Sequence, residues 1–493
     1  MRNDEQRTGG IRPVHDWLQD LDVSFVRGAG SRLADEVGGD LLAAFQQMGH
    51  RVRDVPQEDT EVILTTARFG EPLDWREALL FTARRQFALE DSPSIYTLVH
   101  ATPSELERAL AHLRSVLTTS PPIPADYDFP GLAENAYQVL FEQGRRGGPL
   151  LALERVIQSQ AKCIDVLLIV GDESPEEAYL FNLVGAHPRI CAADPEAFHR
   201  DVVTRIATAE STEEVTDHTF AGEPISQAVW TALDTPQAMC RAGEELGLRG
   251  FFTQMVRIAD LVNVPAVAGA VSSQYSEGCF STWDPKLSGL IATVTGSARP
   301  VYKGAVTDAD LAVITGLKPD GSGALVQPIA GHVNAPPSSE AVEMLELDKP
   351  LPSIRLPAAW GHPAEVPVVR SKLHGHRGCV RYDPQRVEYV PMAPAYQHYP
   401  VTCATSAQAR GIAEAFSQAE ALQDPDDSRP VVFTVLPGHG IIIVEKWVAG
   451  AAPFQTIWEA MDTGSLEIEK LVPQGPVEYV PEGNGMNVRR VRS

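Results

Sequence analysis

The chain has 493 residues, of which 44% are hydrophobic and 22% charged, and its formal net charge is −24. This length predicts two or three domains and a core large enough to fold without disulfides. The acidic balance argues against non-specific binding to nucleic acid or anionic membranes, since both need basic patches. We therefore expect no nucleic acid and no membrane partner, whereas a small-molecule substrate, even an anionic one held by a local cationic site, is compatible with this charge.

Cysteine usage and the N-terminus bear on the compartment. The six cysteines are scattered and form no C-x-x-C pair, so reduced thiols are expected. The first residues, MRNDEQRTGGIRPVHDW, are polar and unlike a signal peptide. The sequence contains no apolar run of about 18 residues, the length of a membrane-spanning helix. These features predict a cytoplasmic protein.

Short apolar runs alternate with amphipathic stretches over the first ~215 residues, a pattern typical of α/β structure with a parallel sheet. A proline-rich stretch at 118–131 suggests a linker. We expect an N-terminal α/β region at 1–125 and a second α/β segment at 126–215, which could belong to the same domain. Strands are predicted at 23–29, 61–70, 94–102 and 163–173, and helices at 33–49, 104–117, 148–162, 175–186 and 195–210.

The sequence contains neither G-x-G-x-x-G nor G-x-x-x-x-G-K-[ST]. It therefore gives no support to a classical dinucleotide-binding or P-loop site. After a boundary near 210–225, the remaining chain divides into a metal-binding domain at 216–475 and a solvated tail at 476–493. From about residue 270 the sequence is strand-like and rich in glycine and proline.

Three histidines suggest a metal site in this second half. His374 and His376 follow an apolar run in VPVVRSKLHGH, and residues two apart on a strand point to the same face. His439 lies in PGHG between two apolar runs, which predicts a tight turn between buried strands. Either feature alone is also common in proteins that bind no metal.

One carboxylate accompanies the histidines. Glu340 follows Pro-Pro-Ser-Ser, where Ser338 or Ser339 is predicted to cap a helix with Glu340 in its first turn. The alternative is that Glu340 only stabilises the predicted helix, since a carboxylate near a helix N-terminus interacts favourably with the helix dipole. Together with the three histidines, however, it would make a chemically sensible Zn²⁺ site with an open position for substrate.

The order of motifs resembles the class II aldolase/adducin family, best known through L-fuculose-1-phosphate aldolase, over about residues 220–465. The motifs are EGCFS (277–281), ATVTGS (292–297), PPSSE (336–340), HGH (374–376) and PGHG (437–440). The resemblance implies an α/β/α domain, a divalent metal and a homo-oligomer, which in the family is a tetramer. It leaves the first ~215 residues unexplained.

The resemblance also implies roles for individual residues. His374, His376 and His439 match the metal ligands, with Zn²⁺ favoured and Mn²⁺, Fe²⁺ or Co²⁺ as alternatives. Glu340 matches the acid/base carboxylate, and Tyr396 is our candidate for the tyrosine that protonates an oxygen across a subunit interface, with Tyr389 and Tyr399 as rivals. The positions that match substrate-binding residues are Ser281, Thr295, Gly296, Ser338 and Ser339.

The implied reaction is retro-aldol cleavage of a hydroxy-ketone or hydroxy-acid through a metal-stabilised enediolate. The same scaffold supports dehydration, epimerisation and decarboxylation, and adducin itself is a non-catalytic interaction module. Cys279 stands where the family has a phosphate-binding asparagine, and a thiol is a poor hydrogen-bond donor. The resemblance therefore leaves open whether the substrate is phosphorylated.

Overall fold

The structure is a computed structural model of the protein. The residues described are 18–69, 93–108, 164–182, 185–186, 189–212, 215–249, 251–252, 278–295, 303–357, 365–401, 404–424, 426–436, 439–468, 477–482 and 485–490. The predicted linker at 118–131, the predicted helix at 148–162 and most of the one at 104–117 lie outside these residues, as does Gly296.

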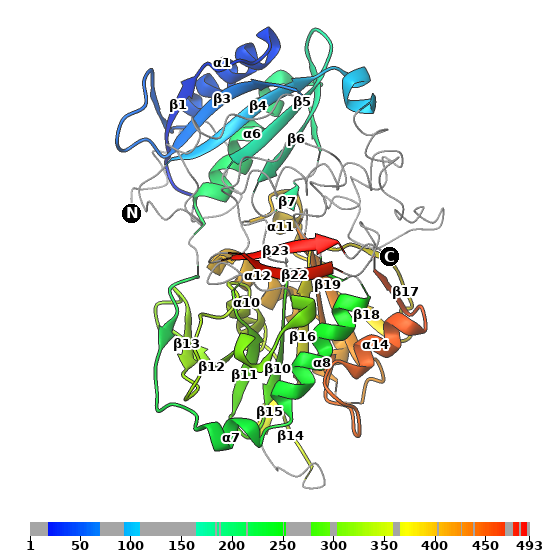
Figure 1. Cartoon of the computed structure of the whole chain (residues 1–493). Coiled ribbons are helices and arrows are strands. Elements are labelled where there is room, and N and C mark those ends of the chain that lie inside the picture. The colour runs from blue at the N-terminus through cyan, green and yellow to red at the C-terminus, as the bar shows by residue number, and fades with distance from the viewer. Residues whose placement is uncertain are drawn as a thin grey trace.

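An eight-stranded sheet forms the N-terminal part of the protein (Figure 1). Its order is β2-β1-β3-β4-β5-β6-β7, with β8 paired to β6, and the strands from β2 to β5 are parallel to their neighbours. The strands are β1 (Asp22–Val26), β2 (Arg51–Arg53), β3 (Val62–Arg68), β4 (Ser94–Ala101), β5 (Ile164–Gly171), β6 (Pro175–Asn182), β7 (Gly185–Ala186) and β8 (Ile190–Cys191).

Both faces of this sheet are covered, which explains why its central strands are continuous apolar runs. On one face Leu98, Leu167 and Ile169 share a core with helices α1 (Arg32–Gln47) and α6 (Pro195–Glu210). Alternate residues of the same strands face the other way and belong to the hydrophobic core of the second sheet.

The predicted helix at 175–186 is wrong, because this segment forms strand β6 and the short β7. Strand β6 returns antiparallel to β5 after a tight turn, with Ala178 opposite Ile169 and Leu180 opposite Leu167. Residues 178–180 are buried on both sides of the strand. Pairing with a buried neighbour therefore outweighs the helix-like spacing of the apolar residues.

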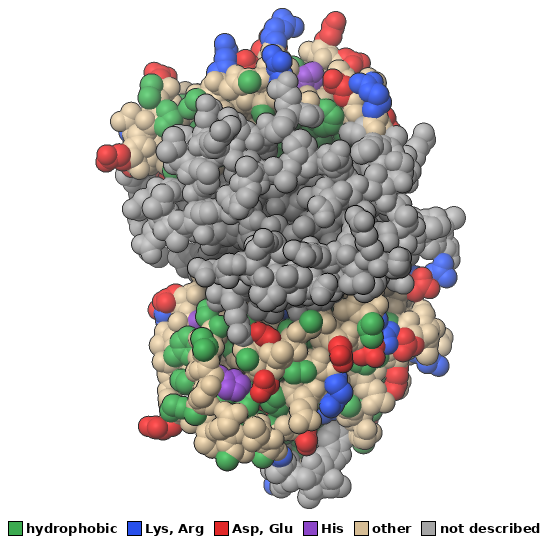
Figure 2. Space-filling model, viewed as in Figure 1, with side chains coloured by type: hydrophobic (Ala, Val, Ile, Leu, Met, Phe, Trp, Pro, Cys, Tyr) green, Lys and Arg blue, Asp and Glu red, His purple; other side chains and the backbone are tan. Residues whose placement is uncertain are grey.

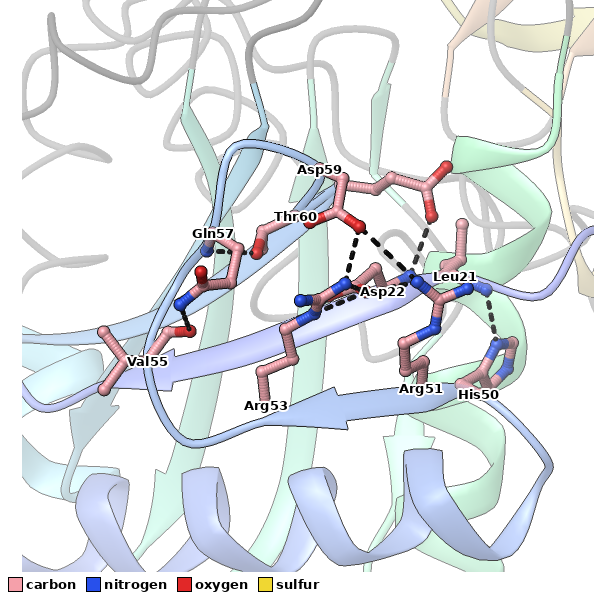
Figure 3. A network of polar contacts seen from close by, with 10 residues as sticks. Leu21, Asp22, His50, Arg51, Arg53, Val55, Gln57, Asp59 and Thr60 are labelled. Carbon is pink, nitrogen blue, oxygen red and sulfur yellow. Dashed lines mark hydrogen bonds and ion pairs between the residues drawn. The ribbon is translucent and has the colours of Figure 1, made fainter.

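A buried carboxylate ties the edge of this sheet together (Figure 3). Asp22, at the start of β1, is 3% exposed and accepts hydrogen bonds from Arg51 and Arg53 on β2. Asp59 forms ion pairs with the same two arginines, and the Asp22 amide donates to Glu61 Oε2. The network holds the short edge strand against β1.

The second large sheet has nine strands in the order β18-β19-β20-β16-β10-β11-β12-β13-β9. All neighbouring pairs are antiparallel except the two at its ends, β18 with β19 and β13 with β9. The strands are β9 (Thr219–Phe220), β10 (Cys279–Asp284), β11 (Gly289–Thr293), β12 (Leu311–Leu317), β13 (Ala324–Gln327), β16 (Val369–Gly375), β18 (Val387–Tyr389), β19 (Val431–Leu436) and β20 (Gly440–Lys446).

Helices cover both faces of this sheet. Phe280 of β10 contacts Phe454, the N-cap of α14 (Gln455–Asp462), and lies close to Gly243 of α8 (Thr235–Leu248). Its neighbours Cys279 and Ser281 point the other way, toward α10 (Ala341–Glu346), which packs against α12 (Ser406–Ser417). The two sheets and their helices confirm the predicted mixed α/β class.

Smaller elements complete the described chain. The short helices are α7 (Gln227–Thr231), α11 (Pro394–His398), α13 (Glu420–Gln423) and the 3-10 turns η3 (Lys303–Ala305) and η4 (Asp308–Asp310). The two-stranded pairs are β14 (Ser353–Arg355) with β15 (Glu365–Pro367), β17 (Cys379–Tyr382) with β21 (Leu466–Ile468), and β22 (Val477–Glu482) with β23 (Gly485–Arg490).

In the view of Figure 2, acidic and basic side chains are interspersed on the described surface at both ends of the molecule. Within the described ranges, none of the helices combines the length and the apolarity that crossing a bilayer requires.

Candidate metal centre

Strand β16 presents the first two histidines. His374 is fully buried and lies opposite Cys279 of β10 on one side and Ile442 of β20 on the other. The strand ends at Gly375, so His376 is the first residue beyond it. His439 occupies the turn between β19 and β20, where its amide donates to the Leu436 carbonyl. The predicted turn between two buried strands is confirmed.

Two glycines allow these segments to approach each other. A Cβ on Gly375 would lie 2.2 Å from the ring of Phe251, and one on Gly440 would lie 2.2 Å from the Gly375 carbonyl oxygen. The glycine inside H-G-H and the one after His439 are therefore steric requirements of the site. This explains why both histidine motifs contain glycine.

The three imidazoles form one compact group. Each residue offers a ring nitrogen within 4.8 Å of the others, and the Nε2 atoms of His374 and His439 are 3.2 Å apart. The ring centroid of His376 lies 4.3 Å from that of His439 and 5.3 Å from that of His374. Among the residues that the structure describes, this is the one group of histidine, cysteine and carboxylate side chains close enough to share an ion.

The hydrogen bond of His374 shows which nitrogen is available. Its Nδ1 lies 3.1 Å from the carbonyl oxygen of Ile441, and a carbonyl only accepts, so Nδ1 carries the proton. The lone pair on Nε2 then points toward His439. Metal-binding histidines commonly donate their second N–H to a backbone carbonyl in this way.

The donor set fits a tetrahedral ion. Zn–N bonds of about 2.0–2.1 Å at tetrahedral angles separate two ligand nitrogens by roughly 3.3 Å. The 3.2 Å between Nε2 of His374 and Nε2 of His439 is close to that separation. Three neutral imidazoles suit Zn²⁺ and related transition metals.

The loop that carries Glu340 is attached to the end of β11. Ser338 N donates to the Thr293 carbonyl and Thr295 N to the Pro336 carbonyl, both at 2.9 Å. The hydroxyls of Ser338 and Ser339 donate to Oε2 of Glu340. The predicted cap is corrected, because Glu340 itself is the N-cap residue of α10 and neither serine occupies that position.

Glu340, directly before α10, lies outside the group of side chains close enough to share an ion, and the contacts of α10 relate it to strand β16. Lys372 extends from β16 toward α10. It donates to the carbonyl of Met344 and pairs with Asp348, a residue that lies beyond the C-terminal end of the helix. Two residues further along the strand is His374, and Glu340 lies at the opposite end of the helix from Asp348. Glu340 also acts electrostatically on Cys279, the cross-strand neighbour of His374.

A buried lysine and a thiol accompany Glu340. Lys303 is 2% exposed and its Nζ donates to the Val294 carbonyl at 3.1 Å. Burial lowers the pKa of Lys303, while Cys279, Glu340 and Asp310 act against that shift. Burial, reinforced by Glu340, raises the pKa of the Cys279 thiol, which is therefore neutral at physiological pH. Lys303 was not predicted as a site residue, and its one signal in the sequence is a charge within the apolar run PVYKGAV.

Two further predicted site residues, Ser281 and Tyr396, contact residues other than the three histidines. Ser281 is fully buried, and its hydroxyl donates to Met344 Sδ at 3.2 Å. Tyr396, on α11, packs its ring close to Gly411 of α12. Their predicted roles in substrate binding and proton transfer remain predictions, and that of Tyr396 assumes a neighbouring subunit.

Two further side chains of metal-ligating type in this half make other contacts. Cys379 is buried on β17, and its thiol lies 3.4 Å from the Arg381 carbonyl. His398 lies against the ring of Tyr399 and 3.8 Å from Asp201 of α6.

Comparison of the chain with models of known protein families, with curated proteins and with solved structures found no match.

Proposed function

We propose that this protein is a divalent-metal lyase of the class II aldolase type, with zinc as the preferred ion. The observation that carries the proposal is the convergence of His374, His376 and His439, from two separate segments of the chain, with ring nitrogens within 4.8 Å of one another. Three imidazoles whose ring nitrogens lie within 4.8 Å of one another are a donor set that suits Zn²⁺.

In this proposal the three histidines hold the ion. When bound, a divalent metal would supply Lewis-acid stabilisation of negative charge on the substrate's carbonyl and hydroxyl oxygens. The substrate would be a hydroxy-ketone or hydroxy-acid that offers two neighbouring oxygens.

Glu340 is the proposed acid/base. It would accept the proton of the substrate hydroxyl as the carbon–carbon bond breaks and return a proton to the carbon that is left negatively charged. The hydroxyls of Ser338 and Ser339 support this role, since both donate to the same carboxylate oxygen and orient it. Tyr396 of a neighbouring subunit remains the candidate second proton donor.

An adducin-like binding protein is the competing function. A chain that serves only as a scaffold has no need to keep three histidines, two of them buried, within reach of one ion. The compact histidine group therefore favours a metal enzyme over a non-catalytic scaffold. Dehydration, epimerisation and decarboxylation remain alternatives, and assays with candidate substrates are needed to distinguish them from aldol cleavage.

The test begins with the metal content of the purified protein by mass spectrometry. We expect roughly one transition-metal ion per chain, lost in His376→Ala. His332→Ala is the matched control, because this histidine lies against Trp230 outside the cluster and should leave the metal in place. A wild-type protein that contains no metal and takes up neither Zn²⁺ nor Mn²⁺ would rule out the lyase.

A second step tests the reaction. The metal-loaded protein is incubated with hydroxy-ketones and hydroxy-acids, each with and without a phosphate group, and aldehyde release is followed. Cleavage that depends on the metal supports the aldolase assignment. Loss of water or inversion at a carbinol carbon, without cleavage, would replace it by a dehydratase or an epimerase.

A further inference from the structure

A serine and a histidine meet at the carboxyl edge of the N-terminal sheet, far in sequence from the metal centre. Ser31 follows β1 and is the N-cap of α1, and His100 is the second-last residue of β4. Ser31 Oγ lies 2.9 Å from His100 Nδ1, and His100 Nε2 lies 2.9 Å from the Gly171 carbonyl at the end of β5. Both side chains are partly exposed.

The hydrogen bonds define the direction of this chain of contacts. The Gly171 carbonyl only accepts, so His100 Nε2 carries the proton and Nδ1 is left as the acceptor. Ser31 therefore donates its hydroxyl proton to His100 Nδ1. A nucleophile within hydrogen-bond reach of a base that a third group orients is the arrangement that activates serine for covalent catalysis.

The surrounding loop holds Ser31 firmly in place. Gly28 N donates to Thr66 Oγ1, which in turn donates to Asp35 Oδ1 in the first turn of α1. A Cβ on Gly30 would lie 2.4 Å from Thr66 Cβ, so the loop passes too close to β3 for any larger residue. The glycines before Ser31 thus bring the serine to the edge of the sheet.

Backbone amides next to Ser31 can stabilise negative charge. The first helical hydrogen bond of α1 runs from Asp35 N to the Ser31 carbonyl, so the amides of Arg32 and Leu33 precede it. Ser31 Oγ also accepts from Ala34 N at 3.1 Å. In serine hydrolases of the strand–turn–helix type, an amide of this kind stabilises the developing oxyanion.

The position in the sheet is a second reason to expect a ligand. The order β2-β1-β3-β4-β5 reverses direction between β1 and β3. In open parallel sheets, ligands bind outside the carboxyl ends of the strands at such a reversal. Ser31 follows β1, and Thr66 and His100 lie toward the carboxyl ends of β3 and β4 at the same edge.

We propose that Ser31 and His100 form a second active site, separate from the metal centre, that hydrolyses an ester or thioester. Ser31 Oγ attacks the acyl carbon as its proton passes to His100 Nδ1. The bond to the alcohol or thiol breaks, and that group leaves with the proton. Water, deprotonated by His100, then cleaves the acyl-serine to a carboxylic acid and restores both side chains.

A fluorophosphonate, which reacts with activated serines, tests the proposal on the full-length chain. The expected result is one adduct, mapped to Ser31 by peptide mass spectrometry, and p-nitrophenyl acetate hydrolysis that the adduct abolishes. His100→Gln keeps a donor for Gly171 but removes the base, and should slow labelling by about 100-fold. Ser31→Ala should lose the adduct.

Ser226→Ala is the matched control, because Ser226 is another helix N-cap, on α7, whose side chain bonds an amide. It should label like the wild type. Circular dichroism confirms that each variant is folded, and His100→Gln keeps the test decisive if Ser31→Ala does not fold. An unlabelled Ser31 in folded wild-type protein, or equal labelling rates in wild type and His100→Gln, would overturn the proposal and leave Ser31 as a helix cap only.

Discussion

Lys372 and Asp348 form a buried ion pair that joins strand β16 to the chain just beyond α10. Lys372 is fully buried and lies on the same strand and face as His374, two residues away. Asp348 follows the helix that begins after Glu340. The ion pair thus fixes the helix that follows the proposed base relative to the strand that carries a proposed metal ligand.

Removing one partner of this pair should destabilise the protein strongly. Asp348→Asn or Lys372→Met leaves the other charge buried without its counter-ion, and we expect each to cost about 3 kcal/mol of unfolding free energy in urea titrations. The double variant should lose much less than the sum. Lys349→Ala, which breaks an exposed ion pair with Glu346, should cost less than about 1 kcal/mol. Equal losses in Asp348→Asn and Lys349→Ala would contradict the prediction.

Glu340→Gln should separate catalysis from metal binding. An amide keeps the size of the side chain and its contact with Ser338 but cannot accept a proton as a base. We expect the metal content to stay at the wild-type level while turnover falls by about 100-fold or more. Glu346→Gln, on the same helix, is the control and should keep both. Metal loss in Glu340→Gln would show that the carboxylate is a ligand.

Local sequence patterns predicted much of the fold. Segments such as 94–101 and 195–210 form the expected strand and helix because their apolar spacing agrees with the packing they find. His439 lies in the expected turn because Pro and Gly next to it leave few other conformations. Strand β6 was missed, since its partner β5 determines its structure.

The three histidines of the candidate site could be recognised in the sequence, but their surroundings could not. Cys279 lies beside His374 through pairing of strands almost a hundred residues apart, and local spacing gives no indication of that register. Lys303 is buried and close enough to Glu340 for the two charges to interact, and a lysine in an apolar run gives no indication of this neighbour. Chemistry-bearing residue types can be read from a sequence, whereas their neighbours depend on long-range packing.

Gly440→Ala should disturb the metal centre without touching a ligand. The new Cβ would lie 2.2 Å from the Gly375 carbonyl oxygen and 3.1 Å from the Cα of His376, and backbone atoms cannot move aside cheaply. We expect a loss of about 1–3 kcal/mol in stability and weaker zinc binding by calorimetry. Gly39→Ala is the control, because its Cβ would meet nothing within 4 Å on helix α1. Unchanged zinc affinity in Gly440→Ala would argue against the proposed close approach.

Alkaline pH should loosen the contact between α6 and the segment after α11. Burial raises the pKa of Tyr399 to about 12, Asp201 adds to the shift, and Arg205, which lies 5.9 Å from the ring centre, opposes it. An unfolded tyrosine has a pKa of about 10.

Between pH 10 and 12 the folded protein therefore holds a proton that the unfolded chain has released. The stabilisation is fully present below pH 10 and is lost as the pH rises toward 12. Urea midpoints measured from pH 9 to pH 12 should fall more steeply in the wild type than in Tyr399→Phe, which has no phenol to titrate. Tyr389, whose pKa burial also raises, contributes to both curves, so the difference between them isolates Tyr399. Parallel curves for the two proteins would show that the Tyr399 phenol titrates alike in the folded and unfolded chain.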